Sequence, residues 1–225
     1  MSSATGDARA DLGALCARGL DWKIDPSRLL SDVSTARRSA VLVLFGALDS
    51  APSRAIGRVG RDLDVLLQRR SASIGHHPGQ ISFPGGGFEE NDEDLTATAL
   101  REAVEETGLD PAGVETLGTL PPLPIPISNN LVTPVIAWWT RESQVAAVDP
   151  SEAVDVFRMP VADLLEPANR ASVEHLLEGR VVRTPAFTVG DVLVWGFTAI
   201  VLSRLFDELG WTEPWDDDRV VQPYA

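Results

Sequence analysis

The chain has 225 residues, of which 44% are hydrophobic and 23% are charged, and its formal net charge at pH 7 is −14. This size and composition are typical of one globular domain with elaborations, and no apolar run approaches the ~18 residues that a membrane helix needs. The negative charge argues against DNA, RNA and anionic lipid as partners, because those polyanions bind basic surfaces. The single cysteine, Cys16, excludes an internal disulfide and fits a reducing compartment such as the cytoplasm.

The first half of the chain alternates polar segments with short β-prone runs. Residues 1–38 are expected to form a polar, partly helical lead-in. Residues 40–48 form a strongly β-prone run, and residues 63–67 form a second, shorter one. We expect the main domain to span residues 39–210 and a C-terminal tail to span residues 211–225.

Glycine and proline dominate the next stretch, residues 71–87, which reads SASIGHHPGQISFPGGG. Only residues 81–83 of this stretch favour a strand. Because glycine lacks a side chain, clustered glycines allow the backbone to approach a neighbouring group closely. The stretch therefore predicts a binding loop.

A central helix is predicted to follow this loop, with Asn91 or Asp92 as its N-cap and Gly108 as its C-terminal stop. Further strands are expected at residues 114–120, 132–139, 153–159, 187–189 and 192–195. The last two strands flank a hairpin turn at Gly190-Asp191, and an amphipathic helix over residues 198–209 closes the fold. Strands outnumber helices and one helix follows a glycine-rich loop, so the pattern indicates an α+β fold rather than a doubly wound parallel sheet.

Three acidic residues of the central helix, Glu102, Glu105 and Glu106, fall within roughly 100° of arc on a helix that advances ~100° per residue. Like charges at this spacing repel each other, and Arg101 is the only basic residue in the helix. Hard divalent cations prefer carboxylate oxygens, so a cation bound to this face would relieve the repulsion. Taken alone, the acidic stripe also fits a plain solvated surface.

The wider spacing favours the metal-binding interpretation. The pattern G-x5-E-x7-R-E-x2-E-E-x-G is formed by Gly87, Glu93, Arg101, Glu102, Glu105, Glu106 and Gly108. It resembles the Nudix box, the loop-helix-loop signature of the Nudix hydrolases, although Ala103 stands where a larger aliphatic residue is common. The resemblance implies the Nudix fold, an α/β/α sandwich with a mixed sheet. It also implies hydrolysis of a nucleoside diphosphate linked to another group.

The same resemblance implies a metal site. It places Mg2+ or Mn2+ on Glu102, Glu105 and Glu106, assisted by the backbone at Gly86 or Gly87. Cations at such a site neutralise a diphosphate and activate a water molecule for attack on phosphorus, so no covalent intermediate is required.

Other residues of the box are expected to support this chemistry. Arg101 and Glu93 would orient the loop and the helix rather than react. Glu105 or Glu106 would accept the proton of the attacking water, and the acidic pair at residues 89–90 provides further candidates. The identity of the general base is open at this point, because Nudix enzymes place it differently between subfamilies.

Two upstream segments, LLQRRS at residues 66–71 and HPGQISFPGG at residues 77–86, are similar to the extra motif of the coenzyme A pyrophosphatase branch. The segments VTPV at residues 132–135 and VWGFTA at residues 194–199 look like the same branch, whereas Gly75 stands where a basic residue is frequent. The resemblance implies cleavage of coenzyme A or a derivative. Substrate contacts are expected from Arg69, Arg70, Ser71, His77, Gly79, Gln80, Phe83, Gly85 and Gly86. The arginines would provide charge-assisted hydrogen bonds to the phosphates.

The box specifies the chemistry but not the group carried by the substrate. ADP-ribose, NADH and nucleoside triphosphates therefore remain alternatives to coenzyme A. A non-catalytic metabolite-binding protein is an alternative of a different class, and the three mutually repelling glutamates argue against it. The expected partner is a small nucleotide, and the family resemblance adds a homodimer as an expectation.

Overall fold

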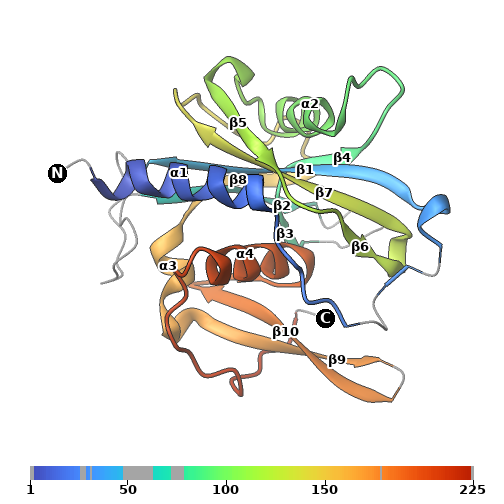
Figure 1. Ribbon diagram of the computed structural model, residues 1–225, viewed down its shortest axis with the longest axis vertical. Helices are drawn as coiled ribbons and strands as arrows, with labels where there is room; N and C mark the ends of the chain where they lie inside the picture. The colour runs from blue at the N-terminus through green and yellow to red at the C-terminus, as the bar shows by residue number, and fades with distance from the viewer. Residues whose placement is uncertain are drawn as a thin grey trace.

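A mixed β-sheet with helices on both faces forms the centre of the structure, a computed structural model (Figure 1). The model describes residues 3–25, 29–30, 32–47, 63–71, 79–177 and 179–223. The helices are α1 (Ser3–Arg18), α2 (Leu95–Thr107), α3 (Val161–Leu165) and α4 (Gly196–Glu208). Among the described residues, no helix is both long and apolar enough to cross a membrane.

The strands fall into two sheets. The central sheet contains β1 (Arg37–Ala47), β2 (Leu63–Arg70), β3 (Ile81–Ser82), β4 (Gly85–Gly87), β5 (Val114–Thr119), β6 (Leu123–Ile125), β7 (Asn130–Trp139) and β8 (Ala153–Pro160). The second sheet contains β9 (Arg170–Leu177), β10 (Arg180–Val189) and β11 (Val192–Val194).

The long strand β1 organises the central sheet. One of its edges pairs in parallel with β7 over nine registered pairs, from Arg37 with Asn130 to Phe45 with Trp138. Its other edge is divided: residues 45–47 pair with β2, whereas residues 39–41 pair with the glycine strand β4. The edge thus splits between β2 and β4, and this split places the glycine loop beside the end of β2. The mixed sheet confirms the expected fold class.

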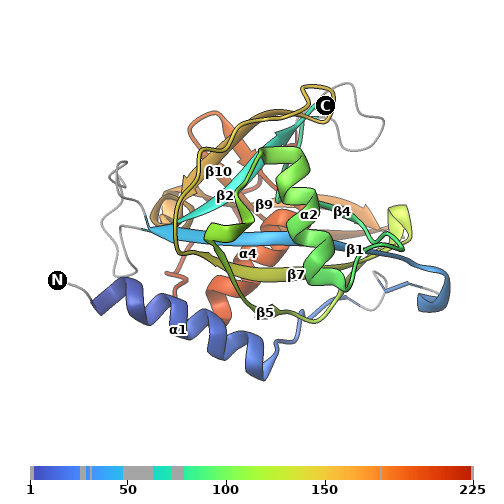
Figure 2. The same ribbon diagram turned by 90° about the horizontal axis from the view of Figure 1, so that it is seen from above.

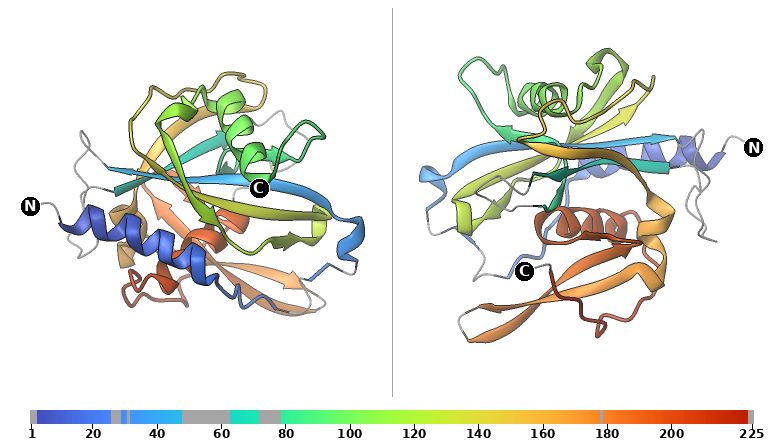
Figure 3. Two further views of the ribbon diagram at one scale, coloured as in Figure 1. Left: turned by 45° about the horizontal axis from the view of Figure 1, so that its top comes forward. Right: turned by 180° about the vertical axis from the view of Figure 1, so that it is seen from behind.

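The alternation of β1 divides its side chains between two cores. Leu42 and Leu44 face α2, whereas Val43 and Phe45 face the core on the opposite side, which contains α1 and α4. Figures 2 and 3 show α2 alone over one face of the sheet, with α4 beneath the other face and the second sheet beyond α4. The α/β/α sandwich is therefore confirmed, with a second sheet added to it.

The lead-in segment contributes to the lower core. Leu12 and Leu15 of α1 are fully buried, and the helix packs along the edge strand β5. Close contact is possible there because Gly118 has no side chain: a Cβ on it would lie 2.7 Å from the Cβ of Cys16. After the helix, Trp22 donates its indole N–H to the Pro121 carbonyl at 2.7 Å.

Several element boundaries differ from the sequence-based expectation. The N-cap of α2 is Asp94, not Asn91 or Asp92, because the Asp94 carboxylate accepts the Ala97 N–H at 2.8 Å. The hairpin at Gly190-Asp191 is confirmed, but β9 and most of β10 were not predicted. Those strands interrupt their apolar pattern with charged residues and a proline, which hides the alternation that identifies a strand. The predicted end of the first strand, Leu48, lies outside the described residues.

We predict that Leu12→Ala lowers the free energy of unfolding by about 2 to 5 kcal/mol, because it removes a fully buried side chain and leaves a cavity. Urea denaturation followed by circular dichroism measures this change. The neighbouring exposed Asp11→Ala is the control and is expected to change it by less than about 0.5 kcal/mol. Equal effects of the two variants would show that α1 does not contribute to the core.

Candidate active site

The central helix α2 is held at both ends by local contacts. Asp94 caps its first turn, and Gly108 ends it in the left-handed conformation (φ 68°), with its N–H bonded to the Val104 carbonyl. The loop after β7 then covers the C-terminal end, because Ala146 N–H and Val148 N–H donate to the carbonyls of Thr107 and Glu106. These contacts fix the direction in which the acidic face of the helix points.

The glycine strand β4 is wedged between β1 and α2. Gly85 has φ +156°, and a Cβ on it would lie 2.3 Å from the Ala40 carbonyl oxygen. A Cβ on Gly86 would lie 2.3 Å from Oε1 of Glu102. Gly85 is thus required sterically, whereas a side chain at Gly86 would displace the Glu102 carboxylate.

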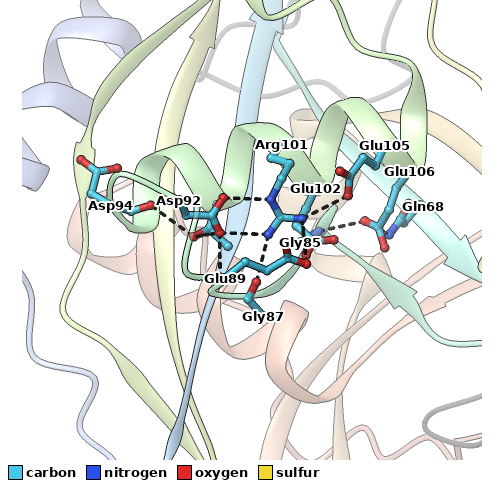
Figure 4. Close-up of polar contacts among 11 residues, drawn as sticks. Gln68, Gly85, Gly87, Glu89, Asp92, Asp94, Arg101, Glu102, Glu105 and Glu106 are labelled. Carbon is cyan, nitrogen blue, oxygen red and sulfur yellow. Dashed lines mark hydrogen bonds and ion pairs between the residues drawn. The ribbon is translucent and has the colours of Figure 1, made fainter.

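Arg101 ties the glycine loop to the helix (Figure 4). Its guanidinium makes a two-pronged ion pair with Asp92, with Nε–Oδ1 at 2.9 Å and NH2–Oδ2 at 3.0 Å. It also donates to the Gly87 carbonyl at 3.0 Å and, through NH1, to Glu102 and Glu105 at 3.1 Å each. The hydrogen bond from Arg101 holds the pKa of Asp92 well below its usual range, and the same bond raises the pKa of Arg101. These contacts join the glycine loop to the helix, which is what the expected orienting role of Arg101 requires.

The expectation that Glu93 orients the loop and the helix is corrected by the structure. Glu93 is exposed and makes no hydrogen bond or ion pair with any described residue. Asp92 takes that role instead, because it lies two residues before the N-cap and points back along α2 toward Arg101. In addition, Asp92 accepts the Glu89 N–H and the Thr98 hydroxyl. Glu89 itself lies 3.9 Å from the guanidinium and is largely exposed.

The three glutamates of the helix have different environments. The side chain of Glu105 is 57% exposed, that of Glu102 is 18% exposed, and Glu106 as a residue is only 7% exposed. Oε2 of Glu106 accepts hydrogen bonds from the Gln68 side-chain amide at 2.7 Å and from the Gly85 N–H at 2.9 Å (Figure 4). Burial raises the pKa of Glu106 to about 7, although both hydrogen bonds and nearby Arg70 act in the opposite direction. Burial also raises the pKa of Glu102, and the charge of Arg101 opposes that shift.

This donor set fits a hard divalent cation. Glu106 is a buried carboxylate whose hydrogen-bond donors are both neutral, and its Oε1 atom has no hydrogen-bond partner among the described residues. Such a carboxylate gains most from a cation placed beside it. The three glutamates are not drawn into one tight cluster here: within the described part of the chain, only exposed Asp216, Asp217 and Asp218 bring three such oxygens within 4.8 Å of one another. Glu105 is instead turned toward Arg101.

The two arginines expected to contact substrate are separated by the strand pleat. Arg70 shares the face of Gln68 and lies near enough to Glu106 to affect its charge, whereas Arg69 points toward the opposite face. Ser71 is buried, and its N–H donates to the Glu152 carbonyl at 2.8 Å. Of this group, Arg70 is the residue that the structure brings to the acidic site.

The remaining expected contact residues divide between site and core. Phe83 is only 2% exposed and packs in the lower core. The expectation that it contacts substrate is therefore corrected: its side chain supports the core. Gly79 is exposed with φ +70°, and the Gln80 carbonyl accepts the Arg70 N–H at 2.9 Å. His77 lies outside the described residues.

A cavity of about 670 Å3 opens near the N-terminal end of α2. Its walls include Arg38 of β1, Leu95 of α2 and Pro121 of the proline-rich loop, together with the end of α1. The Arg38 guanidinium lies 4.7 Å from the ring centre of Phe88, the residue that follows the glycine strand. None of the three glutamates lines this cavity.

Comparison with known proteins agrees with this geometry. The family model described as NUDIX domain matches residues 52–178, more than half of the chain. The chain belongs to the Nudix family. It is 37% identical over 150 residues to Nudix hydrolase 22, chloroplastic, of Arabidopsis thaliana, which covers 64% of this chain and 49% of that protein.

Two other relatives match in a similar way. Nudix hydrolase 15, mitochondrial, of Arabidopsis thaliana is 37% identical over 193 residues, covering 83% of this chain and 63% of that protein. The Uncharacterized Nudix hydrolase NudL of Salmonella paratyphi B is 33% identical over 153 residues, covering 65% and 75%. The chain thus spans about half to two thirds of the length of the Arabidopsis relatives.

Within the Nudix helix, we predict that Glu106→Gln lowers turnover by about two orders of magnitude or more without unfolding the protein. The amide oxygen of the new side chain still accepts hydrogen bonds from Gln68 and Gly85, but the charge is lost. Steady-state kinetics measure the loss, and circular dichroism checks the fold. Near wild-type turnover would contradict the placement of the metal site.

The raised pKa of Glu106 predicts a pH-dependent stability in metal-free protein. The contribution of Glu106 to the free energy of unfolding is fully present below its ordinary pKa of 4.5. It is lost as the pH rises through about 7, because the folded state then buries a charged carboxylate. Relative to Glu106→Gln, the free energy of unfolding of the wild type should fall by on the order of 2 kcal/mol between pH 5 and pH 8. Urea denaturation with a chelator present measures this difference, and a difference that does not vary with pH would refute it.

Proposed function

We propose that this chain is a metal-dependent pyrophosphatase that hydrolyses the diphosphate of coenzyme A or of a coenzyme A derivative. Hydrolysis adds water across the P–O–P bridge and yields 3',5'-ADP and 4'-phosphopantetheine, or its acyl form. The observation that carries the proposal is the acidic face of α2, in which Glu106 is buried with neutral donors only and lies beside half-buried Glu102. Glu105 completes the set at the surface.

In this proposal each residue has a defined task. Glu102, Glu105 and Glu106 hold Mg2+ or Mn2+, with the backbone at Gly86 or Gly87 in support. When bound, such cations neutralise the diphosphate and activate water for attack on phosphorus.

Other residues position the site or handle the proton. Arg101 and Asp92 keep the glycine loop against the helix, so that the carboxylates stay in place. Glu105 is the better placed proton acceptor, because its side chain is solvent-exposed and therefore able to pass the proton on to bulk water.

The choice of coenzyme A is supported by the LLQRRS and HPGQISFPGG segments and by the position of Arg70. Arg70 lies on the same side of the sheet as Glu106, at the end of β2, where a guanidinium is able to bind a phosphate oxygen. We therefore retain Arg70, Gly79, Gln80, Gly85 and Gly86 as the proposed substrate-contact residues.

We also propose the division of the chain into a lead-in (residues 1–38), a Nudix domain (residues 39–210) and a tail (residues 211–225). The lone cysteine supports a reducing location such as the cytoplasm. A homodimer stays a prediction, and sedimentation velocity tests it directly.

The substrate proposal predicts a specific product pattern. Purified protein with Mg2+ or Mn2+ is incubated with coenzyme A, acetyl-CoA, ADP-ribose, NADH or deoxynucleoside triphosphates, and the products are separated by chromatography. We expect 3',5'-ADP and a 4'-phosphopantetheine species from the coenzyme A compounds in preference to products from the other substrates. The Glu106→Gln protein, prepared identically, excludes a contaminating hydrolase.

The other outcomes are equally informative. Preferential cleavage of ADP-ribose, NADH or a triphosphate would retain the Nudix chemistry and reject coenzyme A as the substrate. Absence of products from every compound in the panel would favour a metabolite-binding protein that retains the fold.

A further inference from the structure

Gln68 is a buried polar residue at the point where β2 changes from apolar to charged residues. It follows Leu66 and Leu67 in β2, is only 1% exposed and faces α2. Burying an amide in this way is unfavourable unless the amide is hydrogen-bonded. Its side-chain bond is the 2.7 Å contact from Nε2 to Oε2 of Glu106 (Figure 4). The hydrogen bond to Glu106 therefore compensates part of the cost of burying the Gln68 amide.

The contact distinguishes the two oxygens of Glu106. Oε2 accepts two hydrogen bonds, from Gln68 of β2 and from the Gly85 N–H of β4, and the two donors come from opposite sides of the split in the sheet. Oε1 accepts none from the described residues. A carboxylate held through one oxygen has a fixed orientation, and its second oxygen keeps its lone pairs available for a cation.

The other end of the Gln68 amide makes no hydrogen bond with the described residues. Oε1 of Gln68 is buried without a hydrogen-bond partner, and so is the hydroxyl of Ser82. These two residues are direct cross-strand partners in β2 and β3, so their Cβ atoms lie about 5 Å apart on one face. No hydrogen bond joins these two groups, so among the described residues the contact with Glu106 is the hydrogen bond that orients the amide.

We propose that Gln68 is a positioning residue for the metal site: it anchors Oε2 of Glu106, so that Oε1 is presented to a divalent cation. The inference rests on the metal-dependent chemistry proposed above, but it concerns cation binding and does not depend on the identity of the substrate. Partners of metal ligands in other proteins act in the same way, and their loss weakens metal affinity or activity by about 10- to 100-fold.

Gln68→Met tests this role, because methionine has a similar volume but neither donates nor accepts a strong hydrogen bond. The free Mn2+ signal in electron paramagnetic resonance gives the dissociation constant of Mn2+ for each protein without any substrate. We expect the constant to rise by about 10- to 100-fold in Gln68→Met. Turnover lost at low Mn2+ should recover at high Mn2+, which a general folding defect would not produce.

The matched control is Gln144→Met, which makes the same change at an exposed glutamine in the loop after β7 and should leave Mn2+ affinity unchanged. A dissociation constant of Mn2+ for Gln68→Met that lies within about twofold of the wild-type constant would overturn the proposal. If that variant departs from the wild-type circular dichroism spectrum, Gln68→Asn replaces it, since its shorter amide does not reach Glu106, and the same limit applies. Weakened Mn2+ binding in a protein that hydrolyses none of the panel would support Gln68 while rejecting the proposed function.

Discussion

The close approach of the glycine strand to its two neighbours is the constraint on which the site depends. Gly85 lies against the Ala40 carbonyl of β1, where there is no space for a side chain. Gly86 lies against the carboxylate of Glu102, which a side chain at this position would displace. The approach is possible because β1 pairs with β2 near one end and with β4 near the other. The split edge of the sheet therefore brings backbone N–H groups and the acidic helix face together.

Arg101 then determines how the negative charge of that face is balanced. Its guanidinium neutralises Asp92 and contacts Glu102 and Glu105, but it makes no bond to Glu106. Glu106 is the most buried carboxylate of the helix, and no ion pair with Arg101 compensates its charge. In a chain with a net charge of −14, the proposed function requires cations at this site, because only they would make it favourable for an anionic diphosphate.

Much of the fold and of the chemistry follows from local sequence properties. Hydrophobic runs predicted the strands around β1, β2, β5, β7 and β8. The central strands β1 and β7 are buried on both faces of the sheet and therefore read as nearly continuous apolar segments. The spacing of Glu102, Glu105 and Glu106 placed them on one side of a helix, because helix geometry depends only on residue number. Gly85 and Gly108 likewise have positive φ angles, a backbone conformation that few other residues adopt.

The sequence by itself therefore determined the family, the α+β class and the acidic helix face. Only the tertiary structure decided which residues complete the site. Asp92 rather than Glu93 pairs with Arg101, and Gln68 rather than a charged residue holds Glu106. The first contact spans nine residues and depends on how the chain enters the helix. The second joins residues 38 apart and depends on strand register and burial, which no local pattern specifies. For the same reason the sequence did not distinguish Arg70 from Arg69: adjacent residues of a strand face opposite sides, and only the packed sheet shows which side carries the site.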